Sequence, residues 1–552
     1  MSRELALVIV LALLAWALFA VWRGWRARRN KYAHLPLLSD SGAVARSLFD
    51  VLYVATTEAG NPMERVAVSP LAFRGKAQLG VEDDGVTVDV RGEGRAHIPS
   101  SVIEGAGVAT WTIDKAVDPD GLVFLRWQWG ELMVESFFRV VDHPRDEVIA
   151  ELMSVVREDM RKGSLVIDRR PAALVLEDGT RYEGHAWGAE GETVGELVFN
   201  TGMTGYQETL TDPSYAGQIV VMTAPHIGNT GMNAEDEESR KIWVEGFVSR
   251  DAARRPSNYR SEASLDDVMK KQGIVGITGI DTRALTLKLR EAGVMRAGIF
   301  SAERLGSDPT DQLKRVVAGP QMEGRNLSAE VSVESVRVVP AVGESIGSLA
   351  VIDLGIKEST VHHLAARGFD VHILPESCSW EQIEEIEPIA VFYSNGPGDP
   401  AASDRHVAIL RETLDRELPF FGICFGNQLL GRALGFDTYK LKYGHRGINQ
   451  PVKDRETGRV EITAQNHGFA VDAPREGVVE SPHGYGRVEV SHISLNDNVV
   501  EGLRALDRPA FSVQYHPEAA AGPHDSTYLF DRFRDMVVTR RGNTRAGGDS
   551  NA

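Results

Sequence analysis

Residues 419–434 read Pro-Phe-Phe-Gly-Ile-Cys-Phe-Gly-Asn-Gln-Leu-Leu-Gly-Arg-Ala-Leu and predict a sharp turn from a buried strand into a helix. The apolar run 420–423 has the length of a short buried strand, and the pattern after Cys424 is helical. Gly422 and Gly426 flank the cysteine at −2 and +2, as glycines flank the exposed serine in the G-x-S-x-G turn. The helix N-terminus favours a thiolate over a thiol. The segment therefore predicts an α/β fold with a nucleophilic cysteine at the end of a strand.

The chain contains only two cysteines, Cys378 and Cys424. A buried structural role is the commoner one for a cysteine, and it suits Cys378. It would leave the glycines beside Cys424 unexplained. Two cysteines also exclude a disulfide scaffold and an all-cysteine zinc site, and no metal site is predicted.

A cysteine nucleophile needs a base and a group that orients the base. Residues 510–514 read as a strand and lead into Tyr-His-Pro-Glu at 515–518. His516 and Glu518 are two residues apart, so in extended backbone they point the same way and Glu518 can accept a hydrogen bond from the imidazole. The fold must bring this pair to Cys424.

A third element is the loop Ser-Asn-Gly-Pro-Gly-Asp-Pro at 394–400, which follows the apolar strand 389–392. Its backbone N–H groups can bind a carboxylate or an oxyanion. In isolation the loop would be read as a plain turn.

Together these three elements resemble the class I glutamine amidotransferases, over residues 348–541. The run 349–353 supplies a first buried strand. The resemblance and the alternation of strands and helices imply a doubly wound parallel sheet with the nucleophile at the carboxyl end of a strand.

Four motifs lie in the preceding region, 172–335. They are Phe-Asn-Thr-Gly-Met-Thr-Gly-Tyr-Gln-Glu at 199–208, Thr-Asp-Pro-Ser-Tyr at 211–215, Pro-His-Ile-Gly-Asn at 225–229 and Gly-Ile-Asp-Thr-Arg at 279–283. They resemble the N-terminal α/β domain of the small, glutamine-hydrolysing subunit of carbamoyl-phosphate synthase. The alternatives are ordinary loops, which would not give these motifs in this order, and an amidotransferase for another acceptor, which would carry a different partner domain.

The resemblance implies a role for each matching residue. Cys424 attacks the glutamine carboxamide, His516 protonates the leaving group and later activates water, and Glu518 orients His516. The matching substrate-binding positions, with the backbone N–H groups of Gly396 and Phe425 as the oxyanion hole, are Ser214, Gly396, Gly398, Phe425, Gln428, Asn466, Gly468 and Phe469.

Two residues depart from the family pattern. Phe425 stands where many members have leucine, and Asn427 where many have histidine. Neither removes a member of the triad. We expect these changes to affect glutamine affinity or rate more than the chemistry.

The ammonia must be consumed elsewhere, because the chain has neither a G-x-x-x-x-G-K-[ST] phosphate loop nor an ATP-grasp pattern. We expect no cofactor bound by this chain. The resemblance implies a separate large subunit as partner, in a heterodimer or higher oligomer. That subunit would use ATP and Mg²⁺ and receive ammonia through an internal tunnel, for pyrimidine and arginine biosynthesis.

The N-terminus predicts a membrane anchor. Residues 5–22 contain no charged residue, and at about 1.5 Å per residue they come close to crossing a hydrocarbon core of about 30 Å. Basic residues follow at 23, 26, 28, 29 and 31, so the positive-inside rule places the rest of the chain in the cytoplasm, on a single-pass anchor in the cell membrane. A cleaved signal peptide is the alternative, but no small-residue cleavage site follows the apolar run.

Residues 35–160 predict a small β-rich module after the anchor segment 1–34. Valines alternate over 86–90, and a helix is expected from near Asp142 and Pro144, with apolar residues at 148, 149, 152, 153 and 156. The pattern resembles a pleckstrin-homology-like domain, as in small membrane-anchored proteins encoded in some bacterial pyrimidine operons. His97 and His143 are isolated and carry no catalytic pattern. A linker is expected near 157–171.

The whole chain has 552 residues, a formal charge of −18 and 43% hydrophobic residues. This is ordinary globular composition for about three or four domains, and it excludes a fully disordered chain or a multi-span membrane protein. The acidic balance argues against a nucleic-acid partner. Residues 542–552 predict a disordered tail. A function of a different class stays open, namely a scaffold that tethers a synthase to the membrane with reduced or no glutaminase activity.

Overall fold

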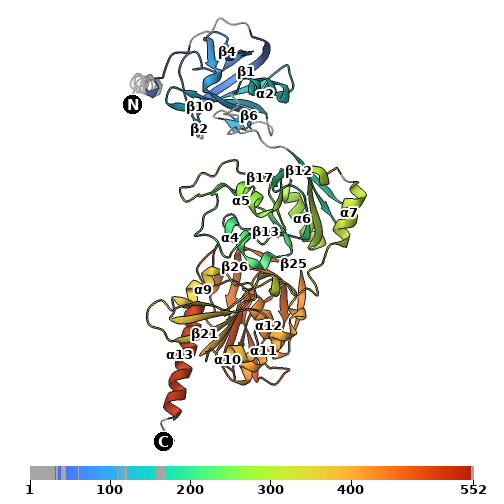
Figure 1. The fold of residues 1–552 in the computed structure, drawn as a ribbon, viewed down its shortest axis with the longest axis vertical. Coiled ribbons are helices and arrows are strands. Elements are labelled where there is room, and N and C mark those ends of the chain that lie inside the picture. The colour runs from blue at the N-terminus through green and yellow to red at the C-terminus, as the bar shows by residue number, and fades with distance from the viewer. Residues whose placement is uncertain are drawn as a thin grey trace, which may run out of the picture. The chain divides into compact units, whose positions relative to one another are not determined.

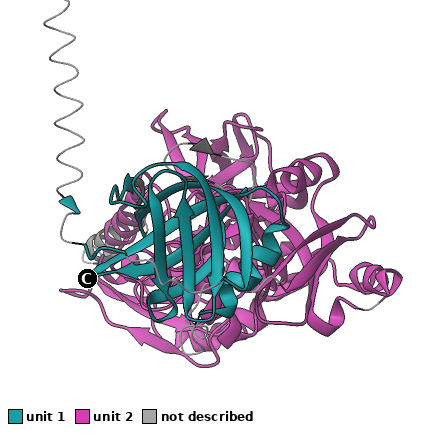
Figure 2. Cartoon of the chain, turned by 90° about the horizontal axis from the view of Figure 1, so that it is seen from above, with its two compact units in different colours: residues 1–167 teal, residues 168–552 magenta. Residues whose placement is uncertain are grey.

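The computed structural model describes residues 31–32, 35–38, 45–59, 61–109, 111–112, 115–116, 121–156, 170–306 and 308–548. The chain divides into two compact units, 1–167 and 168–552, coloured separately in Figure 2. The predicted membrane segment 5–22, the basic residues 23–29 and most of the predicted linker lie outside the described residues. No helix of the described ranges is long and apolar enough to cross a membrane.

The first unit is one antiparallel sheet with a helix after its last strand. The strands follow the order β5-β4-β3-β1-β10-β9-β6, and β2 pairs with β1. Their bounds are β1 Ser47–Glu58, β2 Asn61–Arg65, β3 Gly75–Glu82, β4 Gly85–Val90, β5 Gly94–Pro99, β6 Ile103–Ala109, β9 Leu122–Trp129 and β10 Leu132–Val140, with a short hairpin of β7 Trp111–Thr112 and β8 Lys115–Ala116.

Helix α2, Arg145–Ser154, buries Val148 and Leu152, which lie four residues apart on one face and join the core of the sheet. Trp127 and Trp129 alternate along β9 onto that core and stack at 5.1 Å between ring centroids. The predicted β-rich module with one C-terminal helix is therefore confirmed.

The second unit begins with a closed barrel of seven strands in the order β11-β12-β18-β16-β14-β13-β19 (Figure 1). The strands are β11 Pro171–Leu176, β12 Arg181–Gly188, β13 Glu192–Asn200, β14 Gln218–Met222, β16 Gly246–Val248, β18 Val275–Thr278 and β19 Met295–Ser301. The helices around them are α4 Tyr206–Thr211, α5 Leu265–Gln272, α6 Thr282–Ala292, α7 Pro309–Ala318 and α8 Ser328–Val331, and β15 His226–Ile227 pairs with β17 Asp251–Ala252.

The rest of this unit is built on an eleven-stranded sheet with the order β20-β22-β21-β23-β24-β30-β29-β28-β25-β26 and with β27 paired to β28. The strands are β20 Arg337–Val339, β21 Gly347–Ile352, β22 Phe369–Leu374, β23 Ala390–Tyr393, β24 Phe420–Ile423, β25 Asp437–Asp454, β26 Val460–Asp472, β27 Val478–Glu480, β28 Arg487–Ser494, β29 Val500–Ala505 and β30 Ala510–Val513.

Helices cover both faces of this sheet, as a doubly wound fold requires. One core contains side chains of α10 Trp380–Glu384, α11 Asp404–Asp415 and α12 Phe425–Leu434. The opposite core contains side chains of α9 Glu358–Ala365 and α13 Tyr528–Gly548. Five neighbouring strands, from β22 to β30, are parallel.

Two predictions need correction here. The sheet is not wholly parallel, because β29, β28, β25 and β26 extend it in antiparallel order beyond β30, and β20 is antiparallel at the other edge. Only Leu506 to Pro509 separate β29 from β30, and so short a connection permits only antiparallel pairing. The tail predicted to be disordered from residue 542 continues as α13 to Gly548, a helix whose first turns are anchored by buried Phe530 and Phe533.

Candidate active site

Cys424 lies between β24 and α12 in a backbone conformation that side chains rarely adopt, with φ 54° and ψ −99°. Its N–H donates to the carbonyl of Val513 on the neighbouring strand β30 at 2.8 Å, which fixes the turn to the sheet. The residue is only 2% exposed. The strained turn predicted from the glycine pattern is therefore present, at the carboxyl end of a central parallel strand.

The two flanking glycines are required by close approach. A Cβ on Gly426 would lie 2.5 Å from the carbonyl oxygen of Tyr393, and one on Gly422 would lie 2.7 Å from that of Gly426. Both neighbours are backbone atoms, which cannot move aside without shifting a strand or the helix. The sequence G-x-C-x-G is thus what allows α12 to start directly behind the cysteine.

We expect Gly426→Ala to cost about 2 kcal/mol of stability, because the added methyl overlaps Tyr393, and to lower kcat for glutamine by at least about 10-fold through displacement of Cys424. Thermal unfolding and glutamine turnover measure the two effects. The control is Gly306→Ala, where the nearest atom to the new Cβ is 3.5 Å away and the backbone is not left-handed. Equal stability of the two variants would show that the close approach is unimportant.

His516 and Glu518 meet as the two-residue spacing predicts. The imidazole Nδ1 donates to Glu518 Oε1 at 2.7 Å, and both side chains are buried. Within the described residues the other ring nitrogen, Nε2, has no hydrogen-bond partner. Burial would lower the pKa of His516, but the charge of Glu518 and the nearby Cys424 thiol raise it to about 10. The imidazole is therefore held in a protonated form, with Nε2 left for the reacting groups.

Lys357 completes this arrangement, and the sequence reasoning missed it. Its Nζ lies 3.1 Å from Glu518 Oε1, donates to the carbonyl of Ala520 at 2.6 Å and lies 3.9 Å from Glu238 on the barrel domain. Burial would raise the pKa of Glu518, but the charges of Lys357 and His516 hold it well below its usual range. Lys357 follows β21, whose carboxyl end shares an edge with β24, and that placement could have indicated it.

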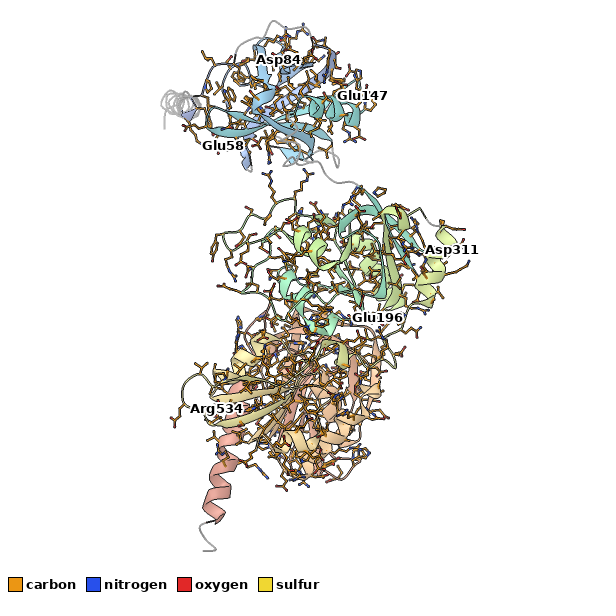
Figure 3. The ribbon with its side chains drawn as sticks, viewed as in Figure 1. Glu58, Asp84, Glu147, Glu196, Asp311 and Arg534 are labelled. Atoms are coloured by element: carbon orange, nitrogen blue, oxygen red, sulfur yellow. The ribbon has the colours of Figure 1, made fainter. Side chains whose placement is uncertain are left out.

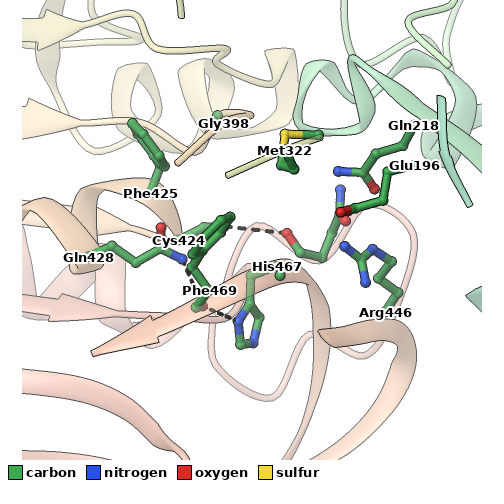
Figure 4. Close-up of a pocket in the computed structure, with 13 residues that line it drawn as sticks. Glu196, Gln218, Met322, Gly398, Cys424, Phe425, Gln428, Arg446, His467 and Phe469 are labelled. Atoms are coloured by element: carbon green, nitrogen blue, oxygen red, sulfur yellow. Dashed lines mark hydrogen bonds between the residues drawn. The ribbon is translucent and has the colours of Figure 1, made fainter. Parts of the chain in front are cut away.

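A pocket opens beside Cys424, with an empty volume of about 350 Å³ that includes solvent at its mouth (Figure 4). All the predicted substrate-binding residues except Ser214 line it. The sequence reasoning missed several of its other residues, because they come from the barrel domain and from the middle of β25 and β26. The lining consists of Glu196, Gln218, Met322, Gly396, Gly398, Cys424, Phe425, Gln428, Arg446, Asn466, His467, Gly468 and Phe469.

Gly396 and Phe425, the predicted oxyanion-hole residues, lie together in this lining. Phe425 is the first residue of α12, where an N–H has no partner within the helix. A Cβ on Gly396 would lie 2.1 Å from the carbonyl oxygen of Leu354, so only glycine fits there. The two backbone N–H groups are suited to an oxyanion formed at Cys424, and this role stays a prediction.

Ser214 is not among the residues that line this pocket. Its Oγ accepts a hydrogen bond from Asn395 Nδ2 at 2.9 Å, and the neighbouring Asp212 accepts one from Asn466 Nδ2 at 3.0 Å. These bonds join the Asp-Pro-Ser-Tyr segment of the barrel domain to the loop after β23 and to strand β26 of the amidotransferase domain. The predicted contact of Ser214 with glutamine stays a prediction.

Asn427, one of the two departures from the family pattern, does not line the pocket. It is fully buried, donates to Gln514 Oε1 at 3.1 Å and accepts from Ser512 Oγ at 2.8 Å. It therefore fastens α12 to β30. Phe425, the other departure, does line the pocket.

Two groups of side chains have the composition of a metal site. One, within the second unit, is His445, His467 and Glu501; the other, in the first unit, is Glu82, Asp84 and His97. In the first of these each ring nitrogen already has a partner: His445 contacts Glu501 at 3.2 Å and Asp497 at 2.8 Å, and His467 contacts the carbonyl of Phe469 and Gln465. This group acts as a polar network that supports the pocket strand.

Three family models match the chain. They are described as carbamoyl-phosphate synthase small chain, CPSase domain, at residues 174–299; glutamine amidotransferase class-I, at 350–536; and bacterial PH domain-like, at 33–154.

Among curated proteins, the carbamoyl phosphate synthase small chain of Streptomyces avermitilis is 63% identical over 371 residues, which cover 67% of this chain and 97% of the relative. The small chain of Streptomyces coelicolor is 62% identical over 373 residues, 68% of this chain and 97% of the relative. The small chain of Bifidobacterium longum is 57% identical over 385 residues, which cover 67% of this chain and 95% of the relative.

Proposed function

The chain belongs to the carbamoyl phosphate synthase small chain family, and from that membership we propose how its residues work. It is the glutamine amidotransferase subunit of the synthase, joined to a bacterial PH-like module. The single observation that carries the mechanism is the meeting of Cys424, His516 and Glu518 at one end of the parallel sheet.

In the proposed reaction the Cys424 thiolate attacks the carboxamide carbon of glutamine, and the resulting oxyanion is bound by the N–H groups of Gly396 and Phe425. His516 gives a proton to the leaving nitrogen, the C–N bond breaks, and ammonia leaves behind a γ-glutamyl thioester. Water then attacks the thioester, with His516 taking its proton, and releases glutamate and the free cysteine. Splitting amide hydrolysis into two steps makes each barrier lower.

Glu518 and Lys357 support this sequence electrostatically. The carboxylate of Glu518 fixes the ring of His516 and stabilises the imidazolium. Lys357 keeps Glu518 ionised in a buried site. Because Lys357 also faces Glu238 of the barrel domain, the orientation of the base depends on both domains of the unit.

We propose a large subunit as the consumer of the ammonia, with ATP and Mg²⁺ bound there. A second cavity, lined in part by Asp212, Lys357, Asn466 and His516, lies on the imidazole side of the site. It supports a route by which ammonia could leave without crossing the glutamine pocket. The carbamoyl phosphate formed would serve pyrimidine and arginine synthesis.

The test uses the full chain with its cognate large subunit and glutamine as the only nitrogen source. We expect glutamate and carbamoyl phosphate to appear in a ratio of about one to one, since each ammonia comes from one glutamine. Synthesis from ammonium salts but not from glutamine would contradict the proposal and favour a tethering scaffold.

We further propose that residues 5–22 anchor the chain in the cell membrane with the enzyme in the cytoplasm. Support comes from the uncharged apolar run and the arginines that follow it. The full chain should remain with the membrane after a high-salt wash and be released by detergent, whereas a chain lacking residues 1–30 should be soluble and keep its glutamine turnover. Recovery of the full chain in the salt wash would contradict an anchor.

A further inference from the structure

The first unit contains a group of titratable side chains that the proposed function does not use. Glu82 ends β3, Asp84 lies in the turn before β4 and is labelled in Figure 3, and His97 lies on β5. One nitrogen of His97 and one oxygen of each carboxylate all lie within 4.8 Å of one another. His97 is isolated in the sequence pattern, and only the fold gives it these neighbours.

The backbone around the β3–β4 turn brings these residues together. Strand β4 pairs with β5 in antiparallel register, so His97 lies beside the turn. The N–H of Ser100 donates to the carbonyl of Asp84 at 2.7 Å, which ties the turn to the end of β5. A Cβ on Gly85 would lie 2.3 Å from the carbonyl oxygen of Ile98 and 2.8 Å from Cε1 of His97. Only glycine therefore leaves room for the imidazole at this place.

Glu82 is the fully buried member of the group. Thr87 Oγ1 and Arg95 Nη2 both donate to its Oε1, the second at 3.0 Å. These bonds hold the carboxylate so that Oε2 lies 3.1 Å from Nδ1 of His97. Carboxylates that bind metal ions are themselves fixed by such hydrogen bonds.

The Nδ1 atom of His97 is the observation that points to a ligand. The side chain is 10% exposed, and Nδ1 is buried with no hydrogen-bond partner within the described residues. Because Glu82 Oε2 is only 3.1 Å away, the missing hydrogen bond means that this oxygen lies off the direction in which the ring nitrogen points. This is the relation expected between two ligands of one ion. With an ion about 2.0–2.2 Å from each, tetrahedral ligands lie about 3.3 Å apart.

The donor atoms indicate the class of ion. An imidazole nitrogen with carboxylate oxygens suits zinc and the neighbouring divalent transition metals, whereas Ca²⁺ and Mg²⁺ take oxygen ligands. Asp84 Oδ2 lies 3.8 Å from Nε2 of His97, and the Asp84 side chain is 67% exposed, so it can turn toward the ion. The ion can therefore enter from solvent, and water can fill the remaining position.

We infer that Glu82, Asp84 and His97 form a binding site for one divalent transition-metal ion of the zinc type. The ion joins the β3–β4 turn to β5, which lies at one edge of the sheet. Because the three ligands meet only in the folded module, the bound ion stabilises that module. The inference concerns the first unit alone and does not depend on glutamine hydrolysis.

The test titrates the full chain in detergent with Zn²⁺ by calorimetry and with Co²⁺ by visible absorption. The parent chain carries Cys424→Ala, so that the active-site thiol cannot bind the ion. We expect one ion at this site and the Co²⁺ absorption of a four-coordinate nitrogen–oxygen site. His97→Gln should remove that absorption and weaken Zn²⁺ binding by more than about 100-fold, since even the loss of a group that only orients a ligand costs about 10–100-fold. His143→Gln is the matched control, because His143 pairs with one carboxylate, Asp142, at 2.8 Å in the same unit.

Asp84→Asn keeps the test decisive if His97→Gln does not fold, because the Asp84 side chain is mostly exposed. We expect it to weaken Zn²⁺ binding by about 10-fold or more, whereas Asp89→Asn, at an exposed position on β4, should bind as the parent does. Zn²⁺ should also slow amide hydrogen exchange over residues 82–100 in the parent and not in Asp84→Asn. The inference is overturned if the parent binds no ion, or if a folded His97→Gln or Asp84→Asn chain binds Zn²⁺ as tightly as its control.

Discussion

Cys424→Ala should abolish glutamine-dependent carbamoyl phosphate synthesis, by about 10⁴-fold or more, while ammonia-dependent synthesis stays unchanged. The size of the effect follows from the removal of the thiol that forms the thioester in the proposed mechanism. Ammonia added directly bypasses this chain, so the large subunit keeps its ammonia-dependent synthesis of carbamoyl phosphate. Parallel assays with glutamine and with an ammonium salt measure both rates in the same complex.

The matched control is Cys378→Ala. Cys378 is also buried, and its burial raises the pKa of its thiol to about 11, so it is not a thiolate near neutral pH. We expect this variant to keep glutamine-dependent activity. Loss of activity in Cys378→Ala with retention in Cys424→Ala would reverse the assignment of the nucleophile.

The second large effect is expected from Glu518→Gln, which should lower kcat for glutamine by about 10²–10⁴-fold. The amide can keep the contact with Nδ1 but provides no negative charge to stabilise the imidazolium. Removing that charge also removes the main influence that raises the pKa of His516. The alkaline limb of the rate profile reports the loss of the proton from His516, so it should move to lower pH in the variant.

Glu376→Gln serves as the control for this substitution. The Glu376 carboxylate lies 3.2 Å from Nε2 of the buried His406, and this pair of a partly exposed glutamate and a histidine belongs to the same domain. Its replacement should leave the rate and the pH profile for glutamine unchanged. An unshifted alkaline limb in Glu518→Gln would show that Glu518 does not control the protonation of His516.

The features that the sequence predicted well are those encoded in short local patterns. The glycines around Cys424 predict the turn because a Cβ at either position would overlap backbone atoms. The two-residue spacing of His516 and Glu518 predicts that their side chains point in the same direction. Each is a property of a few consecutive residues. For the same reason most of the pocket could be assembled from the loop 394–400 and the segment 465–469 of β26.

The features that the sequence reasoning missed arise from contacts between distant segments. Lys357 is one lysine after a strand, and only burial beside Glu518 gives it a role. Glu196, Gln218 and Arg446 come from three strands in two domains, and no local pattern marks them as neighbours. Ser214 was predicted from its motif; its hydroxyl accepts a hydrogen bond from Asn395, and its contact with glutamine stays a prediction.

The most direct test of the account is to detect the γ-glutamyl thioester itself. The complex is quenched with acid during steady-state turnover of glutamine, digested and analysed by mass spectrometry. We expect a glutamyl adduct on the peptide that contains Cys424. The adduct should be absent in Cys424→Ala, and it should be more abundant when the attack of water on the thioester is slowed. Turnover of glutamine without an adduct on Cys424, or with an adduct on Cys378, would contradict covalent catalysis by this residue.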